Sequence, residues 1–117
     1  MKRETRTYVF FIFFMSAVFH GVYASVTDAE LSRALMALKG LEYGMTEQQA
    51  VETVREAAMN SGNARAINAL GLFYLNGTFV EKDTLMGVNL LEEAGRSGYA
   101  VAYHNLGVTY KLARYGI

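Results

Sequence analysis

Three residue types are missing from the 117-residue sequence: cysteine, proline and tryptophan. Without cysteine the chain has no disulfide, no thiolate ligand for a metal and no cysteine nucleophile. Without proline, no residue breaks a helix from within by removing a hydrogen bond and clashing with the preceding turn. The length suits one small domain, and the composition favours a domain that is nearly all helix.

An excess of charge of one sign is missing as well. The sequence holds 11 Lys and Arg against 11 Asp and Glu, and no long run has a single sign. Proteins that bind nucleic acid gather Lys and Arg where the phosphates lie. We therefore expect no nucleic-acid partner, and the sequence shows no spacing that predicts a metal site or a cofactor.

Residues 1–24 differ from the rest of the chain. Three basic residues lie among the first six, an apolar run of 12 residues occupies positions 8–19, and the segment ends Val-Tyr-Ala. This order is typical of a secretory signal cut after Ala24. The run is shorter than the roughly 20 residues of a membrane-spanning helix. We expect residues 25–117 to be exported, with a bacterial periplasm as the compartment and no membrane contact; an uncleaved N-terminal anchor is the alternative.

The most informative stretch, residues 56–74, returns 36 residues later as residues 92–110. Unrelated segments of ordinary composition would share roughly one or two of its positions. Nine of 19 are identical: Glu56/Glu92, Ala58/Ala94, Ser61/Ser97, Gly62/Gly98, Ala64/Ala100, Ala66/Ala102, Leu70/Leu106, Gly71/Gly107 and Tyr74/Tyr110. A fixed period of this length indicates a repeat protein.

The shared residues have a helical pattern. Ala66, Leu70 and Tyr74 follow one another at intervals of four, so they form one stripe on a helix. Gly71 lies beside that stripe, and so does its equivalent Gly107; a missing side chain at each place would let a neighbouring helix approach closely. Gly62 follows an apolar helical run and is typical of a helix end. Each repeat is therefore predicted to be a helix, a turn that ends at glycine and a second helix.

At these residues the chain resembles the Sel1-like repeat family, a relative of the tetratricopeptide repeats. The family pattern is matched between residues 31 and 110 by Ala66, Leu70-Gly71, Tyr74, Gly77, Asp83, Ala94 and Gly98. The resemblance implies an all-α fold, a short α-solenoid of about two and a half repeats after the N-terminal signal helix. The helices are expected at residues 28–43, 47–60, 63–76, 84–96 and 99–114. The first repeat is degenerate, with Gly40 and Tyr43 echoing the spacing of Gly71 and Tyr74.

The resemblance also implies a binding surface. The first helix of each pair lines a concave face, whose non-consensus positions meet ligands. These positions mix apolar, amide and basic side chains, as peptide and protein contacts do; the alternative is that they are simply exposed. They are Arg65, Asn68, Leu72, Leu75, Asn76, Val101, His104, Asn105, Val108, Lys111 and Leu112.

The final helix is expected to be open. It is the first half of a repeat, so Tyr103, Leu106 and Tyr110 should lack the second helix that would cover them. Leaving a large apolar side chain in water forgoes up to about 1.5–3 kcal/mol. We therefore expect self-association or partner docking there; the alternative is that the rings fold back on the helix expected at residues 84–96, which could cover only part of the face.

These observations favour a protein-interaction module over an enzyme. His104 is the one histidine after residue 24, and no nucleophile or base is spaced to work with it. The resemblance adds a specific version, an immunity-type inhibitor or regulator of a partner enzyme. A hydrolase akin to β-lactamase-like relatives is the rival interpretation. Those relatives are rich in cysteine, whereas this chain has none. A third interpretation is a truncated repeat fragment with no role of its own.

The N-terminal pattern generates a first prediction. We expect cleavage between Ala24 and Ser25, because the basic, apolar and small-residue order matches what a signal peptidase recognises. Intact-mass measurement of the protein from its native cells tests this expectation. A mass that still includes residues 1–24 would show that the segment is retained as an anchor.

Overall fold

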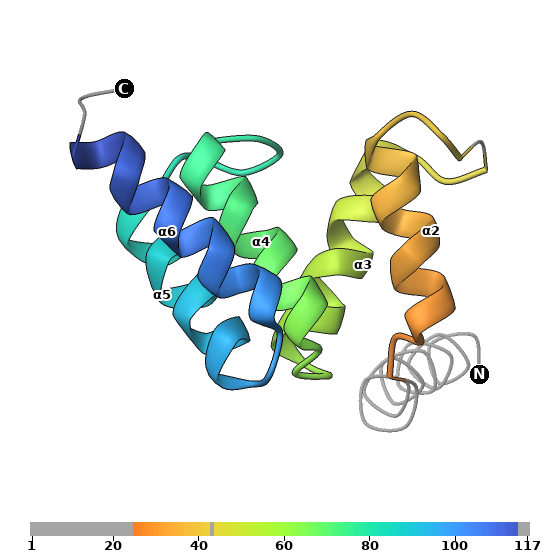
Figure 1. The fold of residues 1–117 in the computed structure, drawn as a ribbon. Coiled ribbons are helices and arrows are strands. Elements are labelled where there is room, and N and C mark those ends of the chain that lie inside the picture. Colours follow the sequence, from red (N-terminus) through yellow and green to blue (C-terminus); the bar gives the residue numbers. More distant parts are fainter. Residues whose placement is uncertain (1–24, 43, 115–117) are drawn as a thin grey trace, which may run out of the picture.

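The computed structural model describes residues 25–42 and 44–114, which form five helices and no strand (Figure 1). The all-helical prediction is therefore confirmed for this part of the chain. The predicted signal segment, residues 1–24, lies outside the described residues, as do Tyr43 and residues 115–117. The helices are α2 (Asp28–Leu38), α3 (Glu47–Met59), α4 (Ala64–Asn76), α5 (Thr84–Arg96) and α6 (Ala100–Arg114).

Four of the helices begin at side-chain caps. At the start of α4 the Asn63 side chain accepts a hydrogen bond from the Ala66 amide at 3.1 Å. At the start of α5 the Asp83 side chain accepts one from the Met86 amide at 3.0 Å. α2 and α3 begin with reciprocal capping boxes, formed by Thr27 with Glu30 and by Thr46 with Gln49. Because a cap satisfies amides that the first turn leaves unbonded, each start is fixed by the local sequence.

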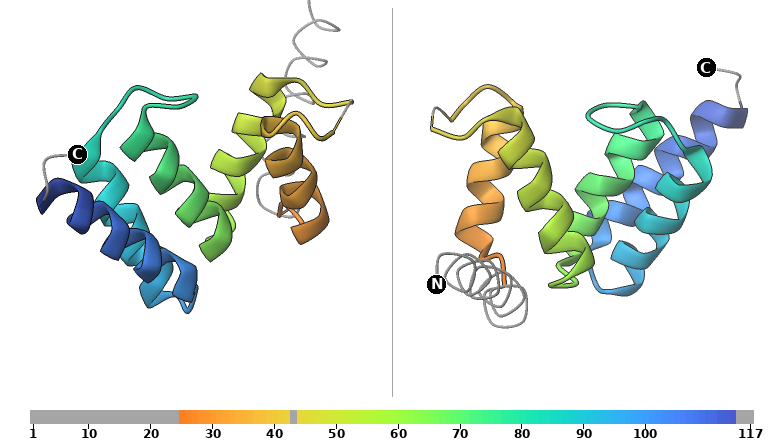
Figure 2. Two further views of the ribbon diagram at one scale, coloured as in Figure 1. Left: turned by 45° about the horizontal axis from the view of Figure 1, so that its top comes forward. Right: turned by 180° about the vertical axis from the view of Figure 1, so that it is seen from behind.

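The 36-residue period of the sequence is also a period of the helices. α2, α4 and α6 begin at Asp28, Ala64 and Ala100, each 36 residues after the one before. Every helix packs against the next along the chain, so the molecule runs from α2 at one end to α5 and α6 at the other (Figure 2). α2 therefore belongs to the same periodic arrangement as α4 and α6.

The core consists mainly of alanine and leucine. Positions that the two matched stretches share are buried alike: Ala66 and Ala102 are fully buried, and Leu70 and Leu106 nearly so. The small alanines let neighbouring helices approach, while each buried leucine contributes about 1.5–3 kcal/mol. The core residues are Leu31, Ala34, Ala50, Val51, Val54, Ala57, Ala58, Ala66, Ile67, Ala69, Leu70, Leu90, Leu91, Ala94, Ala102 and Leu106.

α4 and α5 contact each other closely through two glycines. A methyl group added to Gly71 would lie 3.1 Å from the Gly87 carbonyl oxygen, and one added to Gly87 would lie 2.6 Å from Leu75 Cγ. The expectation that Gly71 lies at a helix contact is therefore confirmed. The same expectation is wrong for Gly107, which is exposed with no atom of another element within 4 Å of its added methyl position.

The predicted extent of α2 is also wrong. The helix ends at Leu38, because Gly40 adopts a left-handed conformation with φ of 73°. The Leu41 amide then donates to the Met36 carbonyl at 2.9 Å, a bond typical of glycine-terminated helices. Gly71 stays helical where α5 packs against it, whereas Gly40 has no such neighbour.

The register assigned to the first repeat was wrong for the same reason. Since α2 begins 36 residues before α4, the position equivalent to Gly71 is Leu35, not Gly40. Gly40 instead ends its helix, as Gly77 does at the end of α4. Gly71 and Gly40 therefore have different roles: Gly71 lets two helices pack closely, and Gly40 ends a helix.

The contrast between Gly71, which is crowded by α5, and Gly107, which is not crowded, yields a stability prediction. Gly71→Ala should lower the free energy of unfolding by about 1–3 kcal/mol, because the added methyl overpacks the α4–α5 contact. Gly107→Ala should be neutral or stabilising by up to about 1 kcal/mol, since alanine is the better helix former where nothing is crowded. Thermal and urea unfolding of the two variants measures both effects. Equal destabilisation would mean that α6 is covered at Gly107.

Candidate functional site

The predicted partner-binding residues lie on α4 and α6, but they differ in exposure. Asn68 is buried, and Leu72, Leu75 and Asn105 are partly buried. The exposed members are Arg65, Asn76, Val101, His104, Val108, Lys111 and Leu112. The surface that could meet a partner is therefore smaller than the sequence predicts.

Asn68 has a structural role. Its side chain is only 6 % exposed, and its Oδ1 accepts a hydrogen bond from Asn105 Nδ2 at 3.0 Å. A buried amide needs such a partner, because an unpaired polar group costs about 1–3 kcal/mol. Asn68, expected on a ligand-binding face, is therefore buried, and its amide links α4 to α6 inside the molecule.

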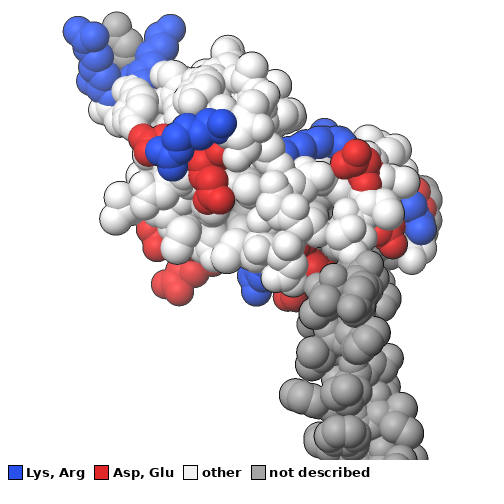
Figure 3. Space-filling view, turned by 90° about the horizontal axis from the view of Figure 1, so that it is seen from below, with Lys and Arg blue, Asp and Glu red and all other residues white. Residues whose placement is uncertain are grey.

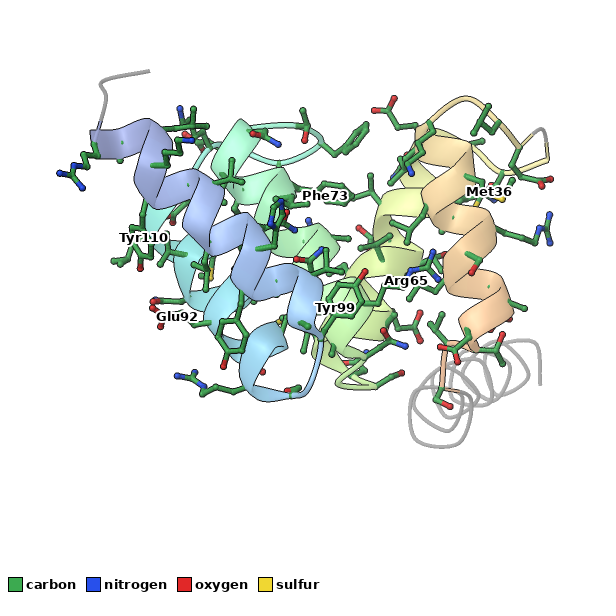
Figure 4. The ribbon with its side chains drawn as sticks, viewed as in Figure 1. Met36, Arg65, Phe73, Glu92, Tyr99 and Tyr110 are labelled. Atoms are coloured by element: carbon green, nitrogen blue, oxygen red, sulfur yellow. The ribbon has the colours of Figure 1, made fainter. Side chains whose placement is uncertain are left out.

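Similar bonds link α4 to α2. Arg65 Nη1 donates to Ser32 Oγ at 2.9 Å across the space between the two helices (Figure 4). Ser32 and Asn68 are 36 residues apart, and each accepts a bond from the next helix of the series α2, α4, α6. His104 holds the third equivalent position; it is exposed, and within residues 25–42 and 44–114 its side chain makes no hydrogen bond.

At one further position, equivalent in α2, α4 and α6, each helix has an apolar side chain. We call Met36, Leu72 and Val108 the apolar row, since each follows the one before by 36 residues. Met36 is 44 % exposed and Val108 43 %, while Leu72 is partly buried. Sequence reasoning missed Met36 because the register of the first repeat was misassigned. Counting back one period from Leu72 would have found it.

The loop between α4 and α5 adds an exposed aromatic ring. Phe79 has φ of 63°, the one positive φ of a non-glycine residue in the described part of the chain, and this conformation costs about 1–2 kcal/mol. Its ring meets Phe73 edge to face with centroids 5.0 Å apart, a contact worth about 0.5–1.5 kcal/mol. Phe73 lies on the side of α4 toward α2 and α3 (Figure 4). No sequence signal marked this pair.

The three residues predicted at the open end have different environments. Leu106 is only 5 % exposed, so the expectation that it is left in water is wrong: like Leu70, it belongs to the core. Tyr103 is 51 % exposed, with one part of its ring against Gly95 of α5. Tyr110 is 54 % exposed at the end of the molecule far from α2 (Figure 4). Two of the three therefore reach solvent.

Metal-binding clusters and membrane-spanning helices are missing from the described residues. None of their His, Asp and Glu residues gather in threes that could hold a metal ion, and no helix among them is long and apolar enough to cross a membrane. Two shallow hollows beside α2 and α3 share Arg33, Met45 and Thr53, and neither contains a histidine. The candidate site consists of the apolar row and its polar neighbours.

Comparison of the chain with family models, with curated proteins and with solved structures found no match.

The internal role of Asn68 can be tested by a double-mutant cycle. Asn68→Ala and Asn105→Ala should each lower the free energy of unfolding by about 1 kcal/mol, with a coupling of about 0.5–1.5 kcal/mol between them. Asn76→Ala, at an exposed amide of the same helix, should change it by less than about 0.5 kcal/mol. Urea unfolding measures all three. Coupling near zero would mean that the bond contributes nothing to the fold.

Proposed function

We propose that this chain is an exported protein-interaction module, a short solenoid of Sel1-like repeats that binds a peptide or protein segment. The observation that carries the proposal is the apolar row, in which one helix position presents an apolar side chain three times. Helical-repeat proteins stack such units and use the extended surface that results for binding. The sequence of the first 24 residues supports export, and the 36-residue spacing of helix starts supports the repeat assignment.

The row suits an extended ligand. An extended peptide advances about 3.3 Å for each residue. A ligand that crosses α2, α4 and α6 in turn would therefore need several residues between the apolar side chains that it brings to the row. Arg65 and His104 provide polar contacts beside the row, which is the usual composition of a protein interface.

A narrower version of the proposal is an immunity-type regulator that holds a partner enzyme inactive. Its support is the resemblance to exported Sel1-like proteins, which is an analogy of fold and not of site. The geometry adds one requirement for such a partner: it must offer an apolar segment long enough to reach Met36 and Val108 together. A rigid partner that meets one helix alone would not satisfy it.

The proposal predicts a specific loss of binding. The partner would first be identified by cross-linking in native cells and then purified. The double variant Met36→Gln, Val108→Gln should bind it with an affinity at least tenfold lower than that of the parent. Two partly exposed apolar contacts are together worth about 1.5–3 kcal/mol, and tenfold corresponds to about 1.4 kcal/mol. Fluorescence polarisation with the purified partner gives the affinities.

The matched control is Met59→Gln, Leu85→Gln. Both positions are exposed and apolar but lie outside the row, on α3 and α5. The control should bind as the parent does. If both double variants weaken binding to the same extent, the partner uses general surface hydrophobicity and the apolar row is not its site.

A further inference from the structure

Charge is divided unevenly among the helices. α3 and α5 contain five glutamates between them, whereas α4 and α6 contain no Asp or Glu. The Lys and Arg residues of α4 and α6 are Arg65, Lys111 and Arg114, and Figure 3 shows basic side chains at the C-terminal end of the described chain. α2 has its two acids in the first turn. The helices that carry the apolar row are therefore neutral or basic beyond the start of α2.

No acid occupies the helix positions that border the apolar row. Residues four apart lie one above the other on a helix, so the residues four positions before and after the row flank it. They are Ser32, Asn68 and His104 before the row, and Asn76 and Leu112 after it on α4 and α6. Asp28, which precedes Ser32 by a further four residues, accepts a hydrogen bond from Asn63 Nδ2 at 3.1 Å. A ligand on the row therefore meets hydroxyl, amide and imidazole groups at its edges, and no carboxylate.

Arg65 lies beside the row without an acidic partner. Its Nη1 donates to Ser32 Oγ at 2.9 Å, and among residues 25–42 and 44–114 no carboxylate lies within ion-pair distance of it (Figure 4). The ion pairs of this part of the chain are made by Arg33 and Arg55 instead. A guanidinium has five N–H donors in a planar fork that matches a carboxylate. Because Ser32 takes one donor and holds the group in place, the others are available to a ligand.

We propose that the segment bound along the apolar row carries an Asp or Glu side chain that pairs with Arg65, between apolar residues that contact Met36 and Val108. This inference rests on the proposed function, because it adds the charge of the ligand to the same surface. Ser32 precedes Met36 by four residues, or about 6 Å along α2, so the guanidinium bonded to Ser32 lies beside the row. An acidic side chain of a ligand that crosses from α2 to α4 reaches it there.

The place of the guanidinium favours a side-chain carboxylate over the carboxylate at the end of a chain. Arg65 belongs to α4 and reaches across to Ser32 of α2, so its charge lies between these two helices. A ligand that contacts both Met36 and Val108 therefore passes the charge and continues on both sides of it. Nucleic acid is disfavoured, because phosphate binding gathers many cations. Beside the row, Arg65 and His104 are the basic residues, and the row itself is apolar.

The probe is a phage-displayed library of random peptides of about 12 residues, about 40 Å long when extended. The peptides are fused at their C-terminal end, so that each carboxylate they offer is a side chain. Peptides selected on the immobilised protein should be enriched in Asp or Glu with apolar residues on both sides.

A selected peptide, made as a fluorescent C-terminal amide, then gives affinities by polarisation. Arg65→Gln should weaken its binding about three- to tenfold, because the ion pair is lost. Replacing the acid of the peptide by its amide should have the same effect on the parent protein. The two changes together should weaken binding no more than either alone, since both remove one and the same interaction.

Three controls separate the ion pair from other effects. Arg96→Gln removes the same charge from an exposed arginine on α5 and should leave binding unchanged. Raising the salt concentration should weaken binding to the parent but change binding to Arg65→Gln little, because salt screens an ion pair that the variant lacks. Unfolding curves of Arg65→Gln should overlap those of the parent, and the change in the peptide tests the pair without altering the protein at all.

The double variant Met36→Gln, Val108→Gln distinguishes failure of this inference from failure of the proposed function. Binding that this variant weakens but Arg65→Gln leaves unchanged, or selected peptides without an acid, would overturn the acidic ligand and keep the apolar row. A library without a binder, or a selected peptide that the double variant binds normally, would overturn both. A sedimentation mass that doubles with concentration and returns to the monomer value in Arg65→Gln would overturn the inference as well, since acids of a second copy would then occupy the surface.

Discussion

The backbone contact between α4 and α5 is the constraint on which the rest of the structure depends. Gly71 and Gly87 bring the two helices together so closely that an added methyl group on either would meet the other's carbonyl oxygen. That approach lets Leu90 and Leu91 reach the core beside Leu70. It also fixes the direction of α5, and α6 packs on α5 in turn. Which side chains of α6 are exposed therefore depends on Gly71 of α4 and Gly87 of α5, because these glycines determine where α5 lies.

The helix starts were predictable because their causes are local. Thr46 and Gln49 bond across a single turn, and Asp83 caps the helix that it precedes, so a short stretch of sequence contains the whole interaction. The end of α2 was less predictable, because Gly40 and Gly71 are the same residue type. What separates them is a second helix that packs on one and not on the other.

The candidate site was harder to predict than the fold. Asn68 has the sequence pattern of a surface amide, and its burial depends on Asn105, which lies 37 residues away. Leu106 appeared open because the helix after it was expected to be missing, yet its side chain faces the core rather than the open side. The period itself identifies the apolar row once the register is right. Exposure thus depends on which side of a helix its neighbours cover.

The hydrogen bonds between side chains on different helices share one property: they join residues 33 to 37 positions apart, close to one repeat. The main helix contacts likewise join consecutive helices. Bringing such segments together closes only short loops, and chains dominated by contacts of this kind fold in microseconds to milliseconds. A helix pair can therefore begin to pack as soon as it has emerged from a ribosome, without waiting for the residues that follow.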